Sequence, residues 1–147
     1  MSLISNRKAH FNYEIMDKYV AGIELFGFEV KSLKGGHGSL EGAHVTVRGS
    51  EAYVVGMFVP PYQPNNTRKD YDPYRNRRLL LQKSEILSLN KAGSTKGLTI
   101  VPLSVYNRGS KIKLDIATAK GKKKFDKRET LKKRQSDRDI ARDIKDR

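Results

Sequence analysis

The sequence predicts a mainly β protein, a small closed barrel with two or three short helices, followed by a basic C-terminal tail. Short runs of alternating apolar and polar residues, separated by glycine and proline, indicate strands that bury one face. This pattern stops after Gly121, beyond which glycine and proline are absent and apolar residues are rare. We therefore expect a barrel domain, residues 1–119, and a tail, residues 120–147.

The first predicted element is a long strand from Tyr13 to Leu25, where apolar residues recur mostly at odd positions. Residues 16–18 indicate a bend or bulge within this strand. Gly22 would permit the close approach of a neighbouring backbone. Residues 6–10 precede the strand as a short basic lead-in.

A short helix is predicted next, because the apolar period changes from 2 to 3.6 at Phe26, Val30 and Leu33. A glycine pair ends this helix. Lys31 and Lys34 would share another face, where they are either solvated surface residues or contacts to a partner.

Two runs, Val45–Arg48 and Ala52–Val55, flank a glycine–serine turn and predict a hairpin. The pattern then lapses from Val59 to Arg78, a proline-rich stretch of a length typical of functional or mobile loops. Tyrosines and basic residues interleave there, which suits either stacked bases and phosphates or a loop pinned to the barrel by its tyrosine rings. These residues are Tyr62, Tyr71, Tyr74, Arg68, Lys69, Arg75, Arg77 and Arg78.

The rest of the barrel domain is predicted to add one helix and two strands. Gln82–Lys91 has a helical pattern, with glycine beyond its end. Leu98–Tyr106 and Lys111–Ala117 alternate as strands on either side of a turn. Pro102 cannot donate to a ladder, so it implies an edge or bulge position. About five or six short strands with small helices indicate an oligonucleotide-binding (OB)-like barrel.

The formal net charge of +14 indicates a polyanionic partner, which could be RNA, DNA or an anionic membrane surface. Half of the excess charge lies in residues 120–147, with 13 Lys and Arg against 6 Asp and Glu. The sequence has no apolar run of about 18 residues, so no membrane span is expected. No signal peptide is expected either. Because cysteine is absent, disulfides and thiolate metal sites are excluded and a cytoplasmic location is expected.

No catalytic constellation is visible in the sequence. His10, His37 and His44 lie in unrelated segments without metal-ligand spacing. The glycines at residues 35–38 lack the Gly-Lys-Ser/Thr ending of a phosphate-binding loop, and no nucleophile elbow is present. We therefore expect a binding protein that is not an enzyme and uses no cofactor or metal. A nuclease is disfavoured.

The sequence of the tail predicts a helix that forms only when the tail is bound to a partner. Asp126 and Glu129 have the spacing of a capping box, and Glu129 precedes Lys133 by four residues. The few apolar residues beyond Asp126 cannot offset the entropy of ordering the segment. We expect the tail to be disordered when free and helical when phosphates neutralise it. The alternative is a solubilising tail without a target.

Five motifs occur in order along the chain. They are Asn6-Arg7-Lys8-Ala9, Ala21-Gly22-Ile23, Gly27-x-Glu29-Val30-Lys31-Ser32-Leu33-Lys34-x-Gly36, Asp72-Pro73-x-Arg75-x-Arg77-Arg78-Leu79-Leu80-Leu81 and Ala119-Lys120-Gly121-Lys122-Lys123-x-x-Asp126-Lys127-Arg128. Together the motifs resemble the family of the SsrA-binding protein (small protein B), the partner of transfer-messenger RNA in bacterial trans-translation. The resemblance extends from Asn6 to about Glu129.

The resemblance implies that the barrel binds the tRNA-like domain of transfer-messenger RNA, in the place of a tRNA anticodon arm. The tail would enter the decoding centre and the empty mRNA channel of the small subunit of a stalled ribosome. The outcome would be rescue of the ribosome and tagging of the incomplete protein. Contacts with the large subunit, an indirect partnership with elongation factor Tu and a monomeric state are also implied.

Site residues are expected from these motifs and the basic residues beside them. The RNA contacts are Asn6, Arg7, Lys8, Lys31, Lys34, Arg75, Arg77, Arg78, Lys113, Lys120, Lys122 and Lys123. The ribosome contacts in the tail are Lys124, Asp126, Lys127, Arg128, Lys132, Lys133, Arg134 and Arg138. One position departs from the family, which usually has glutamate where this chain has Val20. That contact is either lost or passes to a neighbour such as Glu24.

The residues alone leave an alternative, a generic OB-type single-stranded RNA-binding or ribosomal protein. Such a protein would bind oligonucleotides with strong salt dependence and without preference for a tRNA-like fold.

Overall fold

The computed structural model describes residues 2–63 and 69–122. Within these ranges seven strands form one antiparallel sheet in the order β1-β6-β7-β2-β5-β4-β3, accompanied by three helices. The elements are β1 (Ser2–Ser5), α1 (Arg7–Asn12), β2 (Tyr13–Ile23), α2 (Gly27–Lys34), β3 (His44–Arg48), β4 (Glu51–Val55), β5 (Arg77–Leu80), α3 (Lys83–Gly93), β6 (Leu98–Arg108) and β7 (Lys111–Gly121).

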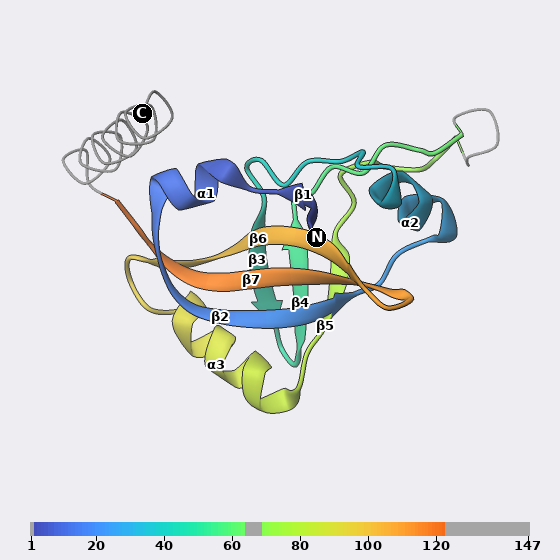
Figure 1. The fold of residues 1–147 in the computed structure, drawn as a ribbon. Helices are drawn as coiled ribbons and strands as arrows, with labels where there is room; N and C mark the ends of the chain where they lie inside the picture. Colours follow the sequence, from blue (N-terminus) through green and yellow to red (C-terminus); the bar gives the residue numbers. More distant parts are fainter. Residues whose placement is uncertain (1, 64–68, 123–147) are drawn as a thin grey trace, which may run out of the picture.

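The prediction of a mainly β protein with a few short helices is confirmed. Figure 1 shows β2, β6 and β7 crossing in front of β3 and β4, so the sheet curls back on itself. Hydrogen bonds between the described residues do not close the predicted barrel, because β1 and β3 are the two edges of the sheet. β3 lies against β6 without forming a ladder. β1 pairs with β6 at residues 104–106 and so occupies part of the edge that a closing strand would need.

The irregularities expected in the strands are present. The pairing of β2 with β7 shifts register within residues 15–18, and that of β6 with β7 shifts between Pro102 and Ser104. Gly22 lies opposite Leu80 of β5, and a Cβ on Gly22 would be only 3.2 Å from the Leu80 Cβ. Glycine at this position therefore lets β5 pack closely on β2.

The sequence pattern did not predict β1, α1 or β5. β1 and β5 each have only four residues, and β5 begins inside the stretch expected to be a loop. β7 runs to Gly121, past the predicted domain boundary at residue 119, because its end pairs with Tyr13 and Glu14 of β2. A separate tail domain stays a prediction, since residues 123–147 lie outside the described ranges.

Buried apolar side chains lie on both faces of the sheet. The larger core is inside the curled sheet and includes Leu33 of α2, Leu89 of α3 and Leu114 of β7. A smaller core lies beneath α1, where Ala9 packs against residues of β6 and β7. This second core fixes the basic N-terminal segment against the end of the last strand.

Candidate nucleic-acid interface

One group of basic residues lies where α1 meets the end of β7. The Lys122 backbone N–H donates to the Asn12 carbonyl at 2.9 Å, and the Lys122 ammonium group lies 3.2 Å from the His10 carbonyl oxygen. The fold thereby joins segments more than 100 residues apart. We use the name α1–β7 cluster for the basic residues of α1 and of the chain at the end of β7, which are Arg7, Lys8, His10, Lys120 and Lys122.

Within this cluster Lys8 has an acidic neighbour. Its ammonium group lies 2.5 Å from Glu41 Oε1, and both side chains are well exposed. Exposed ion pairs contribute only about 0–1 kcal/mol, because water and salt screen them. A phosphate can therefore replace Glu41 as the partner of Lys8 at little cost.

A second basic group lies on α2. Lys31 and Lys34 are exposed on its last turn, and Lys31 Nζ lies 5.7 Å from the centre of the Tyr62 ring. His37 follows the helix and is also exposed. Cationic side chains beside an open aromatic ring can contact both phosphates and bases. We call Lys31, Lys34, His37 and Tyr62 the α2 surface.

Two predicted RNA contacts, Asn6 and Arg77, are buried structural residues. Asn6 caps α1 by accepting from the Ala9 N–H at 3.2 Å, and its amide donates to the Pro102 carbonyl at 2.8 Å. Arg77 has no exposed surface, and its guanidinium donates to backbone carbonyls that include that of Met57. Both side chains are directed into the protein and are hardly accessible here, so their role as direct RNA contacts stays an untested prediction.

Glu29 on α2 is the centre of a buried polar network. Its Oε2 accepts from Arg77 Nε at 2.7 Å and lies 2.9 Å from the Tyr71 hydroxyl, while its Oε1 lies 2.5 Å from Arg75 Nη2. Oε1 also accepts from the Phe26 backbone N–H at 2.8 Å, so Glu29 caps the helix that carries it. The network fixes α2 to β5 and to the segment before β5.

The network changes the titration of two of its members. Burial acts to raise the pKa of Glu29, but the hydrogen bonds from Arg75 and the Phe26 N–H, together with the charge of Arg77, outweigh it and lower the pKa overall. Burial and the hydrogen bond to Glu29 raise the pKa of Tyr71 to about 12. Glu29 is therefore anionic and Tyr71 neutral at physiological pH, which keeps the buried ion pairs intact.

The role of this network was not predicted from the sequence. Phe26 was predicted to share the apolar helical period of Val30 and Leu33, but its side chain is 48% exposed. Tyr71 is pinned by its hydroxyl, as one interpretation of the loop predicted, whereas Tyr62 and Tyr74 are exposed. The sequence signal that could have revealed the burial of Glu29 was its position one helical turn before the apolar Leu33. A buried acidic side chain at that position needs a partner.

Three further predicted contacts remain accessible. The Arg75 side chain is 25% exposed, and Lys113 lies on the outer side of the sheet opposite Gly22. Arg78 is exposed, with its guanidinium 3.4 Å from Glu24 and 3.5 Å from Glu51.

The position that departs from the family lies near Lys113. Val20 is 44% exposed and is paired with Asp115 of β7, which accepts from the Ser104 hydroxyl at 3.4 Å. A carboxylate therefore lies next to Val20 on the neighbouring strand. Glu24 was predicted as a possible replacement for the family's glutamate at this position, and in this structure it is already paired with Arg78.

The predicted tail contacts and Lys123 lie outside the described residues. Among residues 2–63 and 69–122, no group of three or more His, Asp and Glu side chains could hold a metal ion. The helices of this part of the chain are too short and too polar to cross a membrane.

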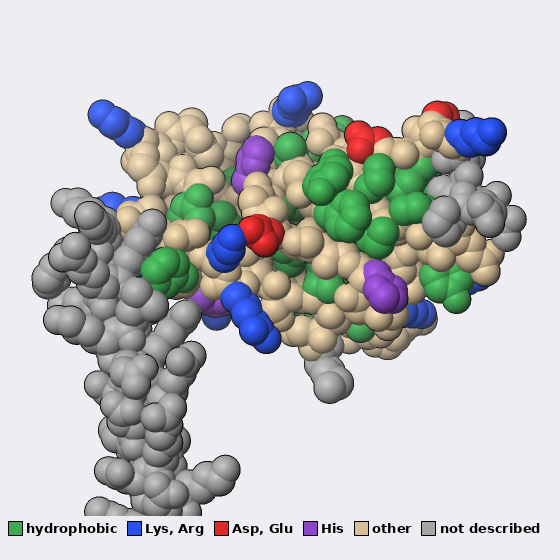
Figure 2. All heavy atoms as spheres, turned by 90° about the horizontal axis from the view of Figure 1, so that it is seen from above, with side chains coloured by type: hydrophobic (Ala, Val, Ile, Leu, Met, Phe, Trp, Pro, Cys, Tyr) green, Lys and Arg blue, Asp and Glu red, His purple; other side chains and the backbone are tan. Residues whose placement is uncertain are grey.

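Figure 2 shows the distribution of charge on one face of the molecule. Lys and Arg side chains are spread apart there, whereas hydrophobic side chains gather on the side where α2 lies. This face therefore offers separate cationic contacts and an apolar region, in place of one continuous basic patch.

A small, curled antiparallel sheet, a large positive charge and exposed lysines on two surfaces define a class of basic β proteins that bind polyanions. Comparison with known proteins narrows this class. The chain belongs to the SmpB protein family, whose model matches residues 3–146.

Individual relatives agree with this assignment. The chain is 45% identical over 142 residues to the SsrA-binding protein of Burkholderia vietnamiensis. This alignment covers 97% of this chain and 96% of that protein. It is 47% identical over 141 residues to the SsrA-binding protein of Elusimicrobium minutum, covering 96% and 89%. A chain in a solved structure described as "tmRNA-SmpB: a journey to the center of the bacterial ribosome" aligns with a TM-score of 0.69 and 38% identity, covering 82% of this chain and 85% of that one.

Proposed function

We propose that this protein binds the tRNA-like domain of transfer-messenger RNA and delivers it to stalled ribosomes in trans-translation. The observation that carries the proposal is the similarity of fold and sequence to the chain of the tmRNA-SmpB structure, at 38% identity over 82% of this chain. The chain acts by binding and not as an enzyme, as a monomer in the cytoplasm.

The described residues supply suitable contacts for RNA. Lys31 and Lys34 of the α2 surface present exposed point charges to phosphates, and the half-exposed Tyr62 ring offers a stacking face. The α1–β7 cluster adds cationic contacts at the other end of the sheet. Asn6 and Arg77 support binding indirectly, because they hold α1 and β5 in place.

The tail has a separate task in this proposal. The predicted tail, residues 120–147, enters the decoding centre and the empty mRNA channel of the small subunit, with further contacts to the large subunit. A cationic segment can enter only a channel that mRNA does not occupy, so the tail reports the absence of mRNA. Elongation factor Tu takes part indirectly, as a member of the delivery complex.

A competition experiment tests the first half of the proposal. The full chain is bound to labelled tRNA-like domain and challenged with unlabelled tRNA-like domain or with single-stranded RNA of equal length. We expect only the folded competitor to displace the label efficiently at physiological salt. Equal displacement by both would favour a generic single-stranded RNA-binding or ribosomal protein.

Truncation after Lys122 tests the second half, because β7 ends at Gly121 and the Lys122 N–H still bonds to α1. The truncated protein should bind the tRNA-like domain with nearly unchanged affinity and fail to support tagging on stalled ribosomes. Loss of RNA binding by the truncated but folded protein would contradict the division of labour between sheet and tail.

A further inference from the structure

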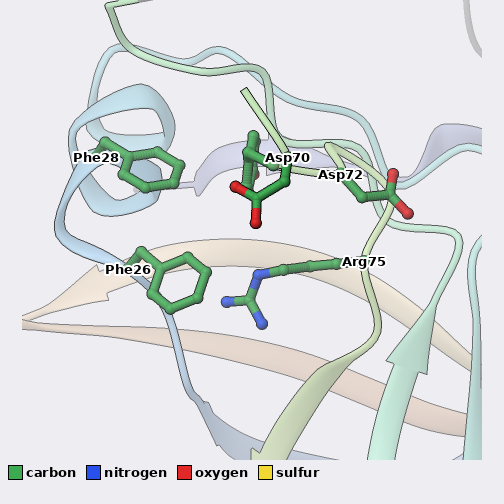
Figure 3. Close-up of a pocket in the computed structure, with 6 residues that line it drawn as sticks. Phe26, Phe28, Asp70, Asp72 and Arg75 are labelled. Atoms are coloured by element: carbon green, nitrogen blue, oxygen red, sulfur yellow. The ribbon is translucent and has the colours of Figure 1, made fainter. Parts of the chain in front are cut away.

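A cleft of about 320 Å³ lies between the start of α2 and the segment before β5. Its lining residues are Phe26, Phe28, Asp70, Tyr71, Asp72 and Arg75. Figure 3 shows the two phenylalanine rings on one side, with the Asp70 carboxylate and the Arg75 guanidinium facing them. The Asp72 carboxylate points away from the cleft. None of the predicted lysine contacts lines this site.

The aromatic rings of the cleft are held in fixed positions. Phe28 meets Tyr71 edge to face, with ring centres 4.7 Å apart at 90°, and the Phe26 ring centre lies 5.6 Å from that of Phe28. Tyr71 is anchored through its hydroxyl, which lies 2.9 Å from Glu29 Oε2 and 2.8 Å from the Val59 carbonyl oxygen. The site is therefore preformed, and binding of a ligand costs little free energy for ordering these side chains.

The Arg75 guanidinium completes the cleft as a rigid, flat group. Its Cζ lies 4.1 Å from the centre of the Phe26 ring. Glu29 holds the guanidinium through both carboxylate oxygens, but it also pairs with Arg77 and so offsets only part of the Arg75 charge. The remaining charge of the lining is negative and comes from Asp70 and Asp72.

Phosphate does not suit a cleft that the Asp70 carboxylate faces, because like charges repel. A nucleobase does, since bases are neutral and flat and stack on aromatic rings and on guanidinium planes. A carboxylate accepts hydrogen bonds from the amino group of cytosine, and the same chemistry applies to adenine and guanine. Asp70 has another interaction in the protein, but a carboxylate offers about four lone-pair sites and can accept more than one donor.

We infer that the Phe26–Phe28–Arg75 cleft binds a single unstacked base that carries an amino group, supplied by the partner RNA. This inference rests on the RNA-binding function proposed above and adds a base-specific contact to it. Phosphate contacts on the α1–β7 cluster and the α2 surface position the RNA, whereas the cleft distinguishes cytosine, adenine or guanine from uracil.

A lysine or arginine from a protein partner is the competing occupant, because aromatic rings beside carboxylates also attract cations. The position of Arg75 disfavours this occupant. A guanidinium already lies on the exposed Phe26 ring, and a second cation entering the cleft would be repelled by it.

The test uses the full-length chain with Phe26→Ala. The Phe26 side chain is 48% exposed and its capping contribution comes from the backbone N–H, so the variant should keep its fold, which urea unfolding verifies. We expect its affinity for the tRNA-like domain to fall roughly 5- to 150-fold, the range for loss of one base–aromatic stack. Leu87→Ala on α3, where the side chain is 70% exposed, is the matched control and should bind like the parent.

Chemical probing identifies the base. Dimethyl sulfate and carbodiimide are applied to the bound RNA, and one base should be protected by the parent protein and become reactive with Phe26→Ala. Replacing that base with uracil should weaken binding to the parent protein and leave binding to Phe26→Ala unchanged. Asp70→Asn should reduce the discrimination against uracil.

The outcomes separate this inference from the proposed function. If the parent protein does not prefer the tRNA-like domain, the proposed function fails and the inference fails with it. If the parent binds and Phe26→Ala binds equally well, with no base changed in reactivity, the inference alone fails. If Phe26→Ala binds RNA normally but loses association with ribosomes, the cleft holds a cation from a protein and the inference is overturned.

Discussion

Glu29 on α2 and Arg77 on β5 form an ion pair without solvent exposure, with 2.7 Å between Glu29 Oε2 and Arg77 Nε. The two residues come from separate sequence motifs that the fold brings together. Arg77 also donates to the Met57 and Pro73 carbonyls, so the pair joins α2, β5 and the intervening loop. The same pair supports the cleft, because Tyr71 and Arg75 are both bonded to Glu29.

Glu29→Gln should destabilise the protein strongly. The substitution removes the negative charge and leaves the buried Arg77 guanidinium uncompensated, which typically costs about 3–5 kcal/mol. Urea unfolding followed by circular dichroism would measure the loss.

Glu24→Gln is the matched control for this prediction. Glu24 and Arg78 are 3.4 Å apart and about half exposed, so breaking that pair should cost no more than about 1 kcal/mol. Equal losses in the two variants would show that the buried position of Glu29 does not matter for stability.

The contribution of Glu29 should depend on pH. Burial raises the pKa of Glu29, but the hydrogen bonds from Arg75 and the Phe26 N–H and the charge of Arg77 bring it below the usual 4.5. The unfolded chain therefore takes up the proton first on acidification. The stabilisation is present above about pH 4.5 and is lost as the pH falls through the lower pKa of the folded state.

Urea midpoints measured from about pH 7 down to pH 3 would check this dependence. The difference between the parent and Glu29→Gln should shrink below pH 4.5. A difference that stays constant to the lowest pH at which the protein folds would contradict the lowered pKa of Glu29.

Asn6→Ala should affect stability and leave the affinity of the folded protein for RNA nearly unchanged. Loss of the cap of α1 costs about 0.5–2 kcal/mol, and the buried Pro102 carbonyl loses its donor as well. Arg7→Gln, at the next position, should weaken RNA binding and leave stability nearly unchanged, because the Arg7 side chain is exposed. Unfolding and RNA-binding measurements on both variants would check this. A loss of affinity in Asn6→Ala at unchanged stability would identify Asn6 as a direct contact.

The strands with regular alternation could be predicted from the sequence, whereas elements that depend on distant partners could not. β2, the β3–β4 hairpin and the β6–β7 pair each carry an apolar face that is buried in the structure. α1 has six residues and depends on the Asn6 cap and on the burial of Ala9 beneath it. An isolated helix of this length is unstable in water, so tertiary packing decides that it forms.

The exposure of Phe26 has a local reason. Phe26 is the N-cap of α2, with an extended backbone at φ −74° and ψ 157°, so the period of the helix does not set the direction of its side chain. Glu29 and Arg77 are 48 residues apart in the sequence, and neither shows from its local pattern that it is buried. For the same reason Arg77 was predicted to be an RNA contact together with Arg75 and Arg78.

Lys34→Gln should weaken binding to the tRNA-like domain at low salt and reduce the dependence of binding on salt. Lys34 is exposed on the last turn of α2, beside Lys31 of the same helix. If its ammonium group neutralises one phosphate, its removal prevents the release of about one counterion and reduces the slope of log K against log salt by about 1. Lys83→Gln on α3 is the matched control, because Lys83 is also exposed but belongs to neither the α1–β7 cluster nor the α2 surface. Equal slopes for the two variants would place the RNA away from the α2 surface, since nonspecific loss of one positive charge affects both proteins alike. A smaller slope for Lys34→Gln alone, at unchanged urea midpoint, requires a phosphate next to α2 and so fixes the orientation of the RNA on the sheet.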